Sequence, residues 1–336
     1  MNLTESSIIS IASKVRHPGA SRIIKGIGDD CAVLRTPGVG AALITTDVFI
    51  EGVHFLPGQP PETVGGKLLT VNLSDVAAMG GRPSEAVVAL MLPEATALDW
   101  VRRFYDGMEA VAVKYGVNIV GGDVSRHPDR ITLALTLTGR ARRDEILFRS
   151  DAKPGDYLYV SGTLGDAEAG LGILKTENMT GEFDFLRARY LSPTPRIELG
   201  RLLARTHTAS ACIDLSDGIA VGTRQLSFAS GLALEIDAAA VPISEQLRNY
   251  CEQKSSDPVK FALTAGGDYE LLFAVPEKNR RRVERFWKTR PELPGVTCIG
   301  RFVEGEPGEV FVSSEGERVA LQGGWEHFCV TSSQNG

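Results

Sequence analysis

The stretch NLSDVAAMG, residues 72–80, is the part of the sequence around which the fold is organised. It lies between Pro60-Pro61 and Gly80, and these residues predict a helix that begins at the prolines and ends at the glycine. At helical spacing, Asn72 and Asp75 fall on the same stripe as apolar residues. Burying an ionised carboxylate is costly unless a cation or hydrogen-bond donors meet it. A lone Ser-Asp pair is also typical of a cap or a solvated edge, so both interpretations stay open for this stretch alone.

A second copy of this pattern occurs far downstream. The stretch DLSDGIAVG, residues 214–222, shares the form x-Leu-Ser-Asp-x-x-Ala-x-Gly with the first. A Gly-Gly-Asp triplet follows the same order, at residues 121–123 and again at 266–268. Two matches in register predict two related halves, each with a carboxylate-bearing segment and a Gly-Gly-Asp turn.

Length and composition describe an ordinary globular protein. A chain of 336 residues is too long for one typical core and long enough for two domains. The formal net charge of -6, with no long block of Lys or Arg, makes nucleic acid a poor candidate partner.

The cysteines and the apolar runs bear on the compartment. The five cysteines are scattered and form no Cys-x-x-Cys pair, which argues against a disulfide framework or a zinc site and for a reducing compartment. The first residues lack the pattern of a secretory signal, and no apolar run is long enough to cross a membrane. We therefore expect a cytoplasmic protein with no membrane partner.

The first half reads as strands that alternate with two long helices. A strand is expected over 41–45, ending on Thr45-Thr46-Asp47, and an amphipathic helix over 98–115. A short strand over 117–120 leads into the first Gly-Gly-Asp triplet, and residues 131–138 alternate as a half-buried strand should. Hydroxyl and carboxylate groups at a strand end are a common place for chemistry in α/β proteins.

The second half repeats the mixture of strands and helices. Strands are expected over 157–161, 232–236 and 271–275, and helices over 196–206 and 277–288. A polar stretch that ends at Pro154-Gly155 separates the halves. We therefore expect an α/β (α+β) fold with two domains, one over residues 1–145 and one over 150–330.

Acidic residues beside glycines or hydroxyls suggest a metal site. If they converge they repel one another, so cations must sit among them. Hard oxygen ligands without a Cys or His cluster suit Mg²⁺, which prefers a few carboxylates together with substrate phosphates. The chemistry implied is phosphoryl transfer or another use of ATP, although the P-loop and protein-kinase motifs are missing. The acids are Asp29, Asp30, Asp47, Asp75, Asp123, Asp214, Asp217 and Asp268.

Together these motifs resemble one family, thiamine-monophosphate kinase, within the superfamily that includes aminoimidazole ribonucleotide synthetase and selenophosphate synthetase. The resemblance covers nearly the whole chain, with the motifs in the family's order. They are GIGDDCAVL from Gly26, TTDVFIEGVHF from Thr45, NLSDVAAMG from Asn72, GGDVSR from Gly121, RSDAKPGD from Arg149, IDLSDG from Ile213 and GDYELLF from Gly267.

The resemblance implies a reaction and an assembly. It implies transfer of the ATP γ-phosphoryl group to thiamine monophosphate, which gives thiamine diphosphate and ADP with the help of several Mg²⁺ ions. It also implies a homodimer formed through the first domains, whose sheets pair into a barrel, and ATP bound between the domains.

The resemblance also assigns roles to residues. Asp30, Asp47, Asp75 and Asp217 would be catalytic. The metal ligands would be Asp30, Thr45, Thr46, Asp47, Asp75, Asp123, Asp214 and Asp217. ATP would be bound by Tyr105, Gly122, Asp123, Arg149 and Ser216, and thiamine monophosphate by His54, Glu270 and Trp325.

The chain departs from the family at one loop, and other functions remain to be weighed. The family has Gly-Gly-acid-Asp-Tyr-Glu-Leu, whereas here Ala265 replaces a glycine and Gly267 replaces an acid. The alternatives are a sister enzyme that activates another acceptor through ATP and a non-catalytic nucleotide sensor on the same fold. A sensor would be free to lose some of the acids, and the full set argues against it.

Overall fold

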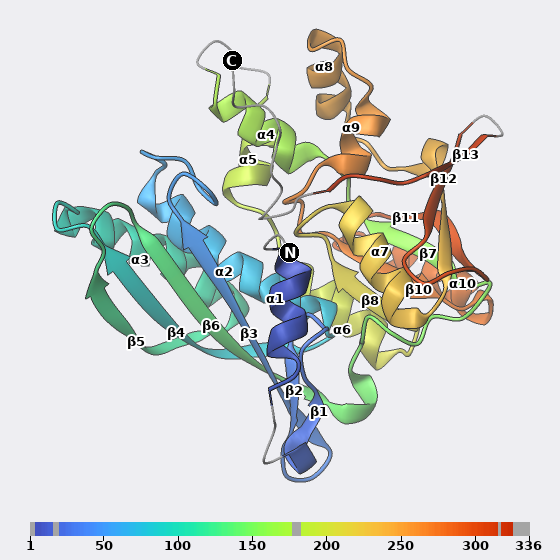
Figure 1. Ribbon diagram of the computed structural model, residues 1–336, viewed down its shortest axis with the longest axis horizontal. Coiled ribbons are helices and arrows are strands. Elements are labelled where there is room, and N and C mark those ends of the chain that lie inside the picture. Colours follow the sequence, from blue (N-terminus) through green and yellow to red (C-terminus); the bar gives the residue numbers. More distant parts are fainter. Residues whose placement is uncertain (1–3, 16–19, 177–182, 315–316, 325–336) are drawn as a thin grey trace.

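Two β-sheets with helices between and around them make up the chain in the computed structural model (Figure 1). The structure describes residues 4–15, 20–176, 183–314 and 317–324. The first sheet belongs to the N-terminal half of the chain and the second to the C-terminal half, so the expected two-domain α/β fold is confirmed. We propose that the domains divide as expected from the sequence, at residues 1–145 and 150–330.

The first sheet has six strands in the order β1-β2-β3-β6-β4-β5. Only β4 and β5 run parallel, and the other neighbours are antiparallel. Helix α2 packs on this sheet and α3 packs beside α2 (Figure 1). The bounds are α1 Glu5–Ala12, β1 Ile23–Lys25, β2 Ala32–Arg35, β3 Gly40–Ile50, α2 Pro61–Ala78, β4 Arg82–Leu92, α3 Leu98–Tyr115, β5 Asn118–Arg126 and β6 Thr132–Arg142.

The second sheet has seven strands in the order β13-β12-β9-β11-β7-β10-β8. Its strands are β7 Tyr157–Ser161, β8 Ala211–Asp214, β9 Ala233–Asp237, β10 Leu271–Val275, β11 Val296–Val303, β12 Val310–Ser314 and β13 Glu317–Ala320. Its helices are α4 Asp166–Leu174, α5 Asp184–Leu191, α6 Ile197–Arg205, α7 Ile219–Ser230, α8 Glu245–Gln253, α9 Pro258–Thr264 and α10 Arg280–Thr289.

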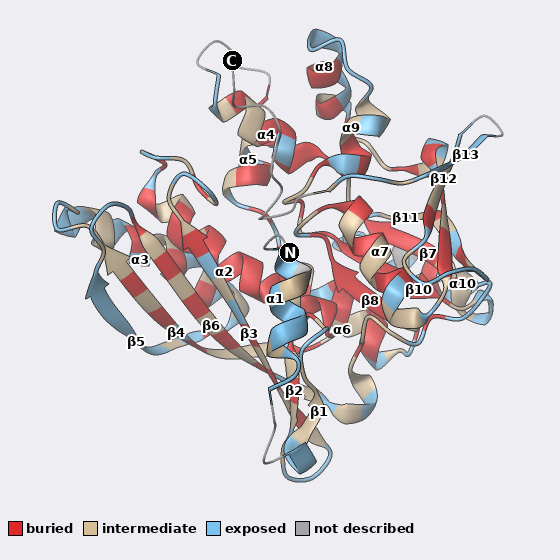
Figure 2. Cartoon of the chain, viewed as in Figure 1, coloured by how far each residue is buried: buried red, intermediate tan, exposed pale blue. Residues whose placement is uncertain are grey.

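Helix α2 lies between the two sheets and is buried on nearly all sides (Figure 2). It contacts β3 and β6 of the first domain as well as α6 and β8 of the second. Helix α6 approaches so closely that a Cβ on Gly200 would lie 1.9 Å from the carbonyl oxygen of Ala77. A helix without a polar face is expected only inside a core, and the apolar core around α2 continues into the second domain at Leu199 and Phe273.

Several expected elements have the observed bounds and others differ. The helix over 98–115 and the strands over 157–161 and 271–275 are present as expected. Strand β3 does not end at residue 45 but continues to Ile50, so Asp47 lies inside a strand. The first Gly-Gly-Asp triplet also lies inside a strand, β5, where a Cβ on Gly122 would lie 1.9 Å from the carbonyl oxygen of Val88. The prediction of a turn at this triplet was wrong because these glycines serve close strand packing.

The two Leu-Ser-Asp segments adopt different conformations. The first is continuous helix within α2. The second follows the end of β8, and Gly218 there has a φ of +88° and precedes α7. The two matching stretches each carry carboxylates, as predicted, but the same residues form helix in one half and a strand exit in the other.

Within the residues that the structure describes, no helix is both long enough and apolar enough to cross a bilayer.

Candidate active site

Three carboxylates meet where α2 passes between the sheets. Asp30 lies two residues before the start of β2, Asp75 lies in α2, and Asp214 ends β8. Each offers an oxygen that lies within 4.8 Å of an oxygen of the other two. The cluster therefore contains groups from both domains, with α2 as the element that joins them.

Hydroxyl groups hold two of these carboxylates in place. The Ser74 Oγ donates a hydrogen bond of 2.7 Å to Asp214 Oδ2, and both groups are buried. The Thr45 hydroxyl of β3 donates to Asp75. Thus the first Leu-Ser-Asp segment binds the residue with which the second one begins.

Two further acids extend the cluster. Asp47 lies two residues after Thr45 on β3, so both side chains point to the face of the sheet on which α2 packs. Burial raises the pKa of Asp47 to about 6, and the nearby negative charge of Asp217 adds to that rise. Asp217 lies in the loop that follows β8, so the second domain supplies a carboxylate next to β3.

The carboxylates of this cluster disfavour their own ionisation. Burial is the largest cause and raises the pKa of Asp214 to about 8, with the charge of Asp30 as the next cause. The pKa of Asp75 is raised well above its usual range by burial and then by Asp47, Asp214 and Asp30. Negative charges that are held together out of water need a cation if all are to ionise.

Two protein cations reach the edge of the cluster. The Arg149 Nη2 lies 2.7 Å from Asp30 Oδ1, and the Lys25 Nζ lies 3.5 Å from Asp29 Oδ2. The Asp29 carboxylate also accepts the backbone N–H of Arg149 at 3.3 Å. Burial and the charge of Asp30 nevertheless raise the pKa of Asp29 to about 6. These two cations therefore do not neutralise the cluster as a whole.

Unsatisfied oxygens show that the cluster fits a metal ion. Within the described part of the chain, the buried atoms Asp30 Oδ2 and Asp47 Oδ2 have no hydrogen-bond partner. Buried polar atoms of this kind call for an explanation, and a bound ion is one of the standard explanations. The donors are carboxylate and hydroxyl oxygens, which are the hard ligands that suit Mg²⁺.

The groups expected to bind ATP are divided between two places. Arg149 lies at the acidic cluster, where its Nε is buried without a hydrogen-bond partner among the described residues. Ser216 is exposed in the loop after β8. Ser216 lies between Asp214 and Asp217 in the sequence, and Arg149 contacts Asp30 of the same cluster.

The other expected ATP and metal groups lie apart from the cluster. Asp123 and Gly122 are on β5, the edge strand, with β4 and β6 between it and β3. At about 4.8 Å per neighbouring strand, β5 is roughly 14 Å from β3. Asp123 pairs in register with Ala89, on the face of the sheet opposite to α2. Tyr105 lies on α3 and is 36% exposed.

Thr46 also lies on the open face of the first sheet. Its Oγ1 donates a hydrogen bond of 3.0 Å to the Leu135 carbonyl and accepts one of 3.1 Å from Thr136. Its neighbours Thr45 and Asp47 point to the other face, because side chains alternate along a strand. Of the three residues at this motif, the structure brings two side chains to the cluster.

His54 lies where the first domain meets α5. Its Nδ1 accepts the backbone N–H of Ile50 at 3.0 Å, and its ring stacks on Phe49 with centroids 5.8 Å apart. The Tyr190 hydroxyl of α5 donates to the His54 carbonyl oxygen at 3.4 Å. The ammonium of Lys67 lies 3.7 Å from the centre of the Tyr190 ring, so a buried lysine of α2 completes this contact.

Glu270 is fully buried among arginines. Its carboxylate accepts hydrogen bonds from Arg189 Nη2 at 2.9 Å, from Arg196 Nε at 2.6 Å and from Ser161 Oγ at 2.5 Å. Arg189 and Tyr190 are neighbours on α5, so this helix connects the Glu270 group with the His54 group. The direct contacts of Glu270 are with protein side chains.

Two other expected residues have different positions. The Asp268 carboxylate accepts the backbone N–H groups of Gly165 and Ala167 at 2.6 and 3.0 Å, at the start of α4. It therefore stabilises a helix terminus away from Asp30 and Asp75. Trp325 lies outside the described residues.

The sequence did not single out Lys67, Arg189 or Arg196. Lys67 lies one turn before Val71 in α2, a helix with buried residues on all sides. The lack of a polar face in this stretch was the signal that could have predicted a buried lysine. Arg189 lies within α5 and Arg196 directly precedes α6, and no motif there distinguishes a buried arginine from a solvated one.

Comparison with known proteins gives matches over nearly the whole chain. Residues 28–141 match the family model described as AIR synthase related protein, N-terminal domain, and residues 153–313 match that of the C-terminal domain. A thiamine-monophosphate kinase of Aquifex aeolicus is 40% identical over 306 residues, which cover 90% of this chain and 93% of that protein. One of Escherichia coli K12 is 38% identical over 309 residues, covering 90% and 91%.

A solved structure has the same fold. It is described as AaThiL complexed with AMPPCP and TMP, is 37% identical, and aligns with a TM-score of 0.84. The alignment covers 98% of this chain and 99% of the other.

Proposed function

Because the chain belongs to the thiamine-monophosphate kinase family, we propose that it transfers the γ-phosphoryl group of ATP to thiamine monophosphate, giving thiamine diphosphate and ADP. The related structure contains AMPPCP, an ATP analogue, together with TMP, and these ligands correspond to the two substrates of this reaction. The chain is therefore a kinase of thiamine biosynthesis that uses ATP as co-substrate.

The observation that carries the proposal is the meeting of Asp30, Asp75 and Asp214 within 4.8 Å at the junction of the two domains. We propose that Mg²⁺ is held there by these acids with Thr45, Asp47 and Asp217. When bound, Mg²⁺ would neutralise phosphate charge and stabilise the charge that develops during transfer. The orphaned oxygens of Asp30 and Asp47 support this assignment.

The protein residues then position the reacting groups. The Arg149 guanidinium, with its free buried Nε–H, is placed to donate to an ATP phosphate oxygen. Ser216, in the exposed loop after β8, would contact the nucleotide from the second domain. The attacking phosphate oxygen of the substrate is ionised near neutral pH. The transfer therefore needs alignment and charge neutralisation more than a general base.

We assign the acceptor substrate to the region between His54 and Glu270. Helix α5 links the two groups through Tyr190 and Arg189. Because Glu270 is enclosed by arginines, its part would be to orient Arg189 and Arg196. Trp325 stays a candidate contact by resemblance alone.

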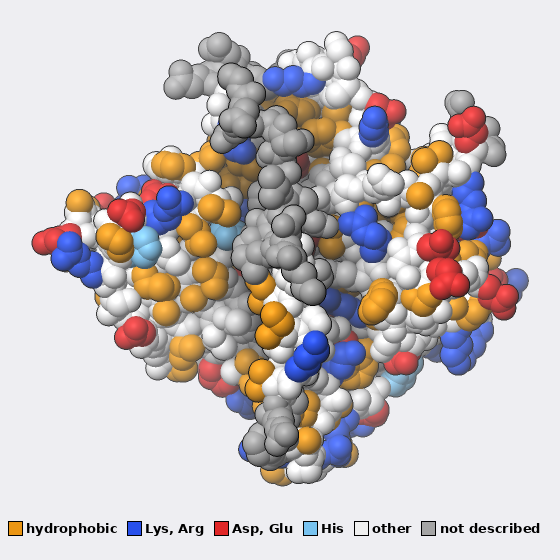
Figure 3. Space-filling model, viewed as in Figure 1, with side chains coloured by type: hydrophobic (Ala, Val, Ile, Leu, Met, Phe, Trp, Pro, Cys, Tyr) orange, Lys and Arg blue, Asp and Glu red, His pale blue; other side chains and the backbone are white. Residues whose placement is uncertain are grey.

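We propose that a homodimer brings the remaining groups into use. Tyr105 lies on α3, which packs beside α2. Gly122 and Asp123 lie on the edge strand β5, away from the acidic cluster, and the side chain of Thr46 lies on the open face. That face carries the exposed apolar side chains of Val48 and Val87, and Figure 3 shows apolar side chains gathered over this half of the molecule. Pairing of two first sheets through this face would cover these side chains and would carry Asp123 toward the cluster of the second copy.

Mixing two inactive variants tests this dimer. In the proposed dimer, each active site contains Asp75 from one copy and Asp123 from the other. Asp75→Asn and Asp123→Asn would therefore each inactivate both sites of their own homodimers. Random pairing of equal amounts should restore roughly a quarter of the wild-type activity, because half of the dimers contain one intact site of two. No recovery after unfolding and refolding the mixture, with the dimer shown by light scattering, would contradict the shared site.

We also place the protein in the cytoplasm. Cys31, Cys212, Cys251 and Cys298 are free thiols, as a reducing compartment would keep them.

A product assay tests the reaction. Protein with ATP, Mg²⁺ and thiamine monophosphate should give thiamine diphosphate and ADP in equal amounts, measured by chromatography. ADP without thiamine diphosphate would indicate a sister enzyme with another acceptor. Absence of both products while ATP still binds would indicate a nucleotide sensor.

A further inference from the structure

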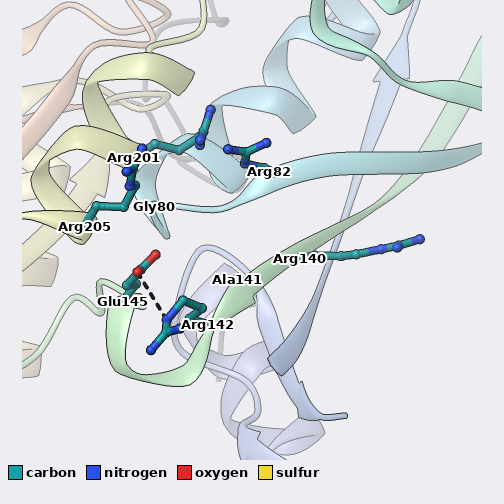
Figure 4. Close-up of a pocket in the computed structure, with 8 residues that line it drawn as sticks. All are labelled: Gly80, Arg82, Arg140, Ala141, Arg142, Glu145, Arg201 and Arg205. Carbon is teal, nitrogen blue, oxygen red and sulfur yellow. Dashed lines mark ion pairs between the residues drawn. The ribbon is translucent and has the colours of Figure 1, made fainter. Parts of the chain in front are cut away.

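A cavity lined by arginines lies at the domain junction, outside the acidic cluster (Figure 4). Its volume is about 330 Å³. Its walls come from the end of α2 and the start of β4, from the end of β6, and from α6 of the second domain. The cavity therefore spans the contact between the domains.

Positive charge dominates the walls of this cavity. They contain five arginines, Arg82, Arg140, Arg142, Arg201 and Arg205, and one acid, Glu145. The chain as a whole has a net charge of -6, so the charge around the cavity is opposite to that of the protein. A local concentration of charge against the overall sign calls for a ligand of the opposite sign.

Two of these arginines are already committed to protein carboxylates. Arg140 pairs with Glu85 at 2.9 Å, and its side chain points away from the others in Figure 4. Arg142 pairs with Asp144 at 3.0 Å and with Glu145 at 3.3 Å. The charges of these two arginines are therefore balanced by protein carboxylates and contribute little to binding an anion.

The other three arginines are less committed, because one has an ion pair only with an exposed glutamate and two have no ion pair among the described residues. Arg201 extends from α6 toward Arg82 of β4, so guanidinium groups of the two domains face the same space (Figure 4). The Arg201 side chain is only 15% exposed, and its ion pair is with Glu198, which is 75% exposed. Within the described ranges, Arg82 and Arg205 form no ion pair.

We propose that Arg82, Arg201 and Arg205 bind a small polyanion of the diphosphate class across the two domains. The planar guanidinium donates two parallel hydrogen bonds to phosphate oxygens, and three such groups match a ligand with several negative charges. A cavity of this size is at the small end of ligand pockets, which favours a diphosphate group over a whole nucleotide. Glu145 and the negative end of the α2 dipole oppose an anion, but their charge is smaller than that of three arginines.

The position of the cavity links it to the domain contact. A Cβ on Gly80 would lie 2.4 Å from the Cβ of Ala204, so the domains touch at this wall. Gly80 follows Asp75 by five residues, and that carboxylate belongs to the acidic cluster. An anion bound here would hold both domains at the end of the helix that carries Asp75, and it would stabilise the folded protein by mass action.

The test is a calorimetric titration of the full chain with inorganic pyrophosphate in the presence of EDTA. Without divalent cations the acidic cluster repels pyrophosphate, so binding reports on the arginines and not on the proposed kinase site. The variant is Arg82→Gln with Arg205→Gln. Both side chains are exposed, and the single variants replace the double one if its thermal unfolding shifts by more than a few degrees. The control is Arg248→Gln, an exposed arginine on α8.

We expect one pyrophosphate site in the wild-type protein, with a dissociation constant at least tenfold larger in the double variant and unchanged in the control. Pyrophosphate should also raise the Tm of the wild-type protein and not that of the double variant. No binding by the wild type at millimolar pyrophosphate would overturn the proposal. Equal affinity in the double variant, or equal weakening in the control, would also overturn it.

Discussion

Two groups of buried carboxylates in this protein are satisfied in opposite ways. Glu270 is fully buried, and its oxygens accept hydrogen bonds from Arg189, Arg196 and Ser161. The acidic cluster of Asp30, Asp75 and Asp214 is also largely removed from water, but its members face one another. Arg149 contacts the cluster only at Asp30.

The difference separates a structural ion pair from a binding site. A buried charge whose partners are all protein groups needs no ligand to be stable. Removing one partner leaves the remaining buried charge uncompensated, which lowers the free energy of unfolding. A buried cluster of like charges has raised pKa values, as Asp47 and Asp214 do, and oxygens without a hydrogen-bond partner, as Asp30 and Asp47 do. Such a group is stable in its ionised form only when a cation from outside joins it.

The largest expected effect is on the reaction. Asp75→Asn should lower kcat by roughly 100- to 1000-fold, the range seen when one preorganised electrostatic group is removed. The metal-free variant should unfold at no lower temperature than the wild type, because the substitution removes a repelled charge. Steady-state rates and thermal unfolding in EDTA measure both quantities. The matched control is Asp129→Asn, an exposed loop residue that should keep the wild-type rate. A fully active Asp75→Asn would remove the acidic cluster from the mechanism.

The opposite pattern is expected at the arginine-paired carboxylate. Glu270→Gln leaves Arg189 and Arg196 buried without their anion and should lower the free energy of unfolding by about 3 kcal/mol. Urea denaturation measures this loss. Glu198→Gln, whose carboxylate is 75% exposed in its pair with Arg201, should show no measurable change. A Glu270→Gln variant as stable as the wild type would mean that the two groups do not differ as described.

The smallest expected effect is a dependence of stability on pH. The folded-state pKa of Asp214 is raised to about 8 from an ordinary value of 3.8, so the folded state holds its proton more strongly. Metal-free protein should therefore lose stability as the pH rises between about 4 and 8, relative to Asp214→Asn.

Magnesium should cancel this loss, because it binds the ionised form. The rise of Tm on adding Mg²⁺ should be larger at pH 8 than at pH 5.5, by roughly 2–4 °C for each kcal/mol of difference. Differential scanning calorimetry at both pH values measures it. An equal rise at both values would indicate that Mg²⁺ does not compete with protons for these carboxylates.

Much of the fold follows from local patterns. Helix α3 is strongly amphipathic and ends at Gly116 in the left-handed conformation. The sequence therefore predicts both the helix and its end. The strands β7 and β10 are apolar runs between turn residues. The repeated Leu-Ser-Asp motif did not reveal the local conformation, because the same residues occur in a helix interior in α2 and in the loop after β8.

The site follows from the sequence only in part. The alternation of side chains along β3 would have separated Thr46 from Thr45 and Asp47, had the strand been extended to its observed length. Contacts between distant segments have no local signal. Ser74 and Asp214 are 140 positions apart, and only the packing of α2 against β8 brings them together. The contacts of Arg189 and Arg196 with Glu270 also lack a local signal, since nothing in α5 or at the start of α6 marks these arginines as buried.

Counting bound metal tests the distinction between the two buried groups most directly. Mn²⁺, which accepts the same oxygen ligands as Mg²⁺, can be titrated into wild-type protein, Asp75→Asn and Glu270→Gln while free Mn²⁺ is followed by electron paramagnetic resonance. We expect the wild type and Glu270→Gln to bind Mn²⁺ alike below the unfolding temperature of the variant, and Asp75→Asn to lose at least one site or bind far more weakly. Undiminished binding by Asp75→Asn would contradict the assignment of the acidic cluster as the metal site.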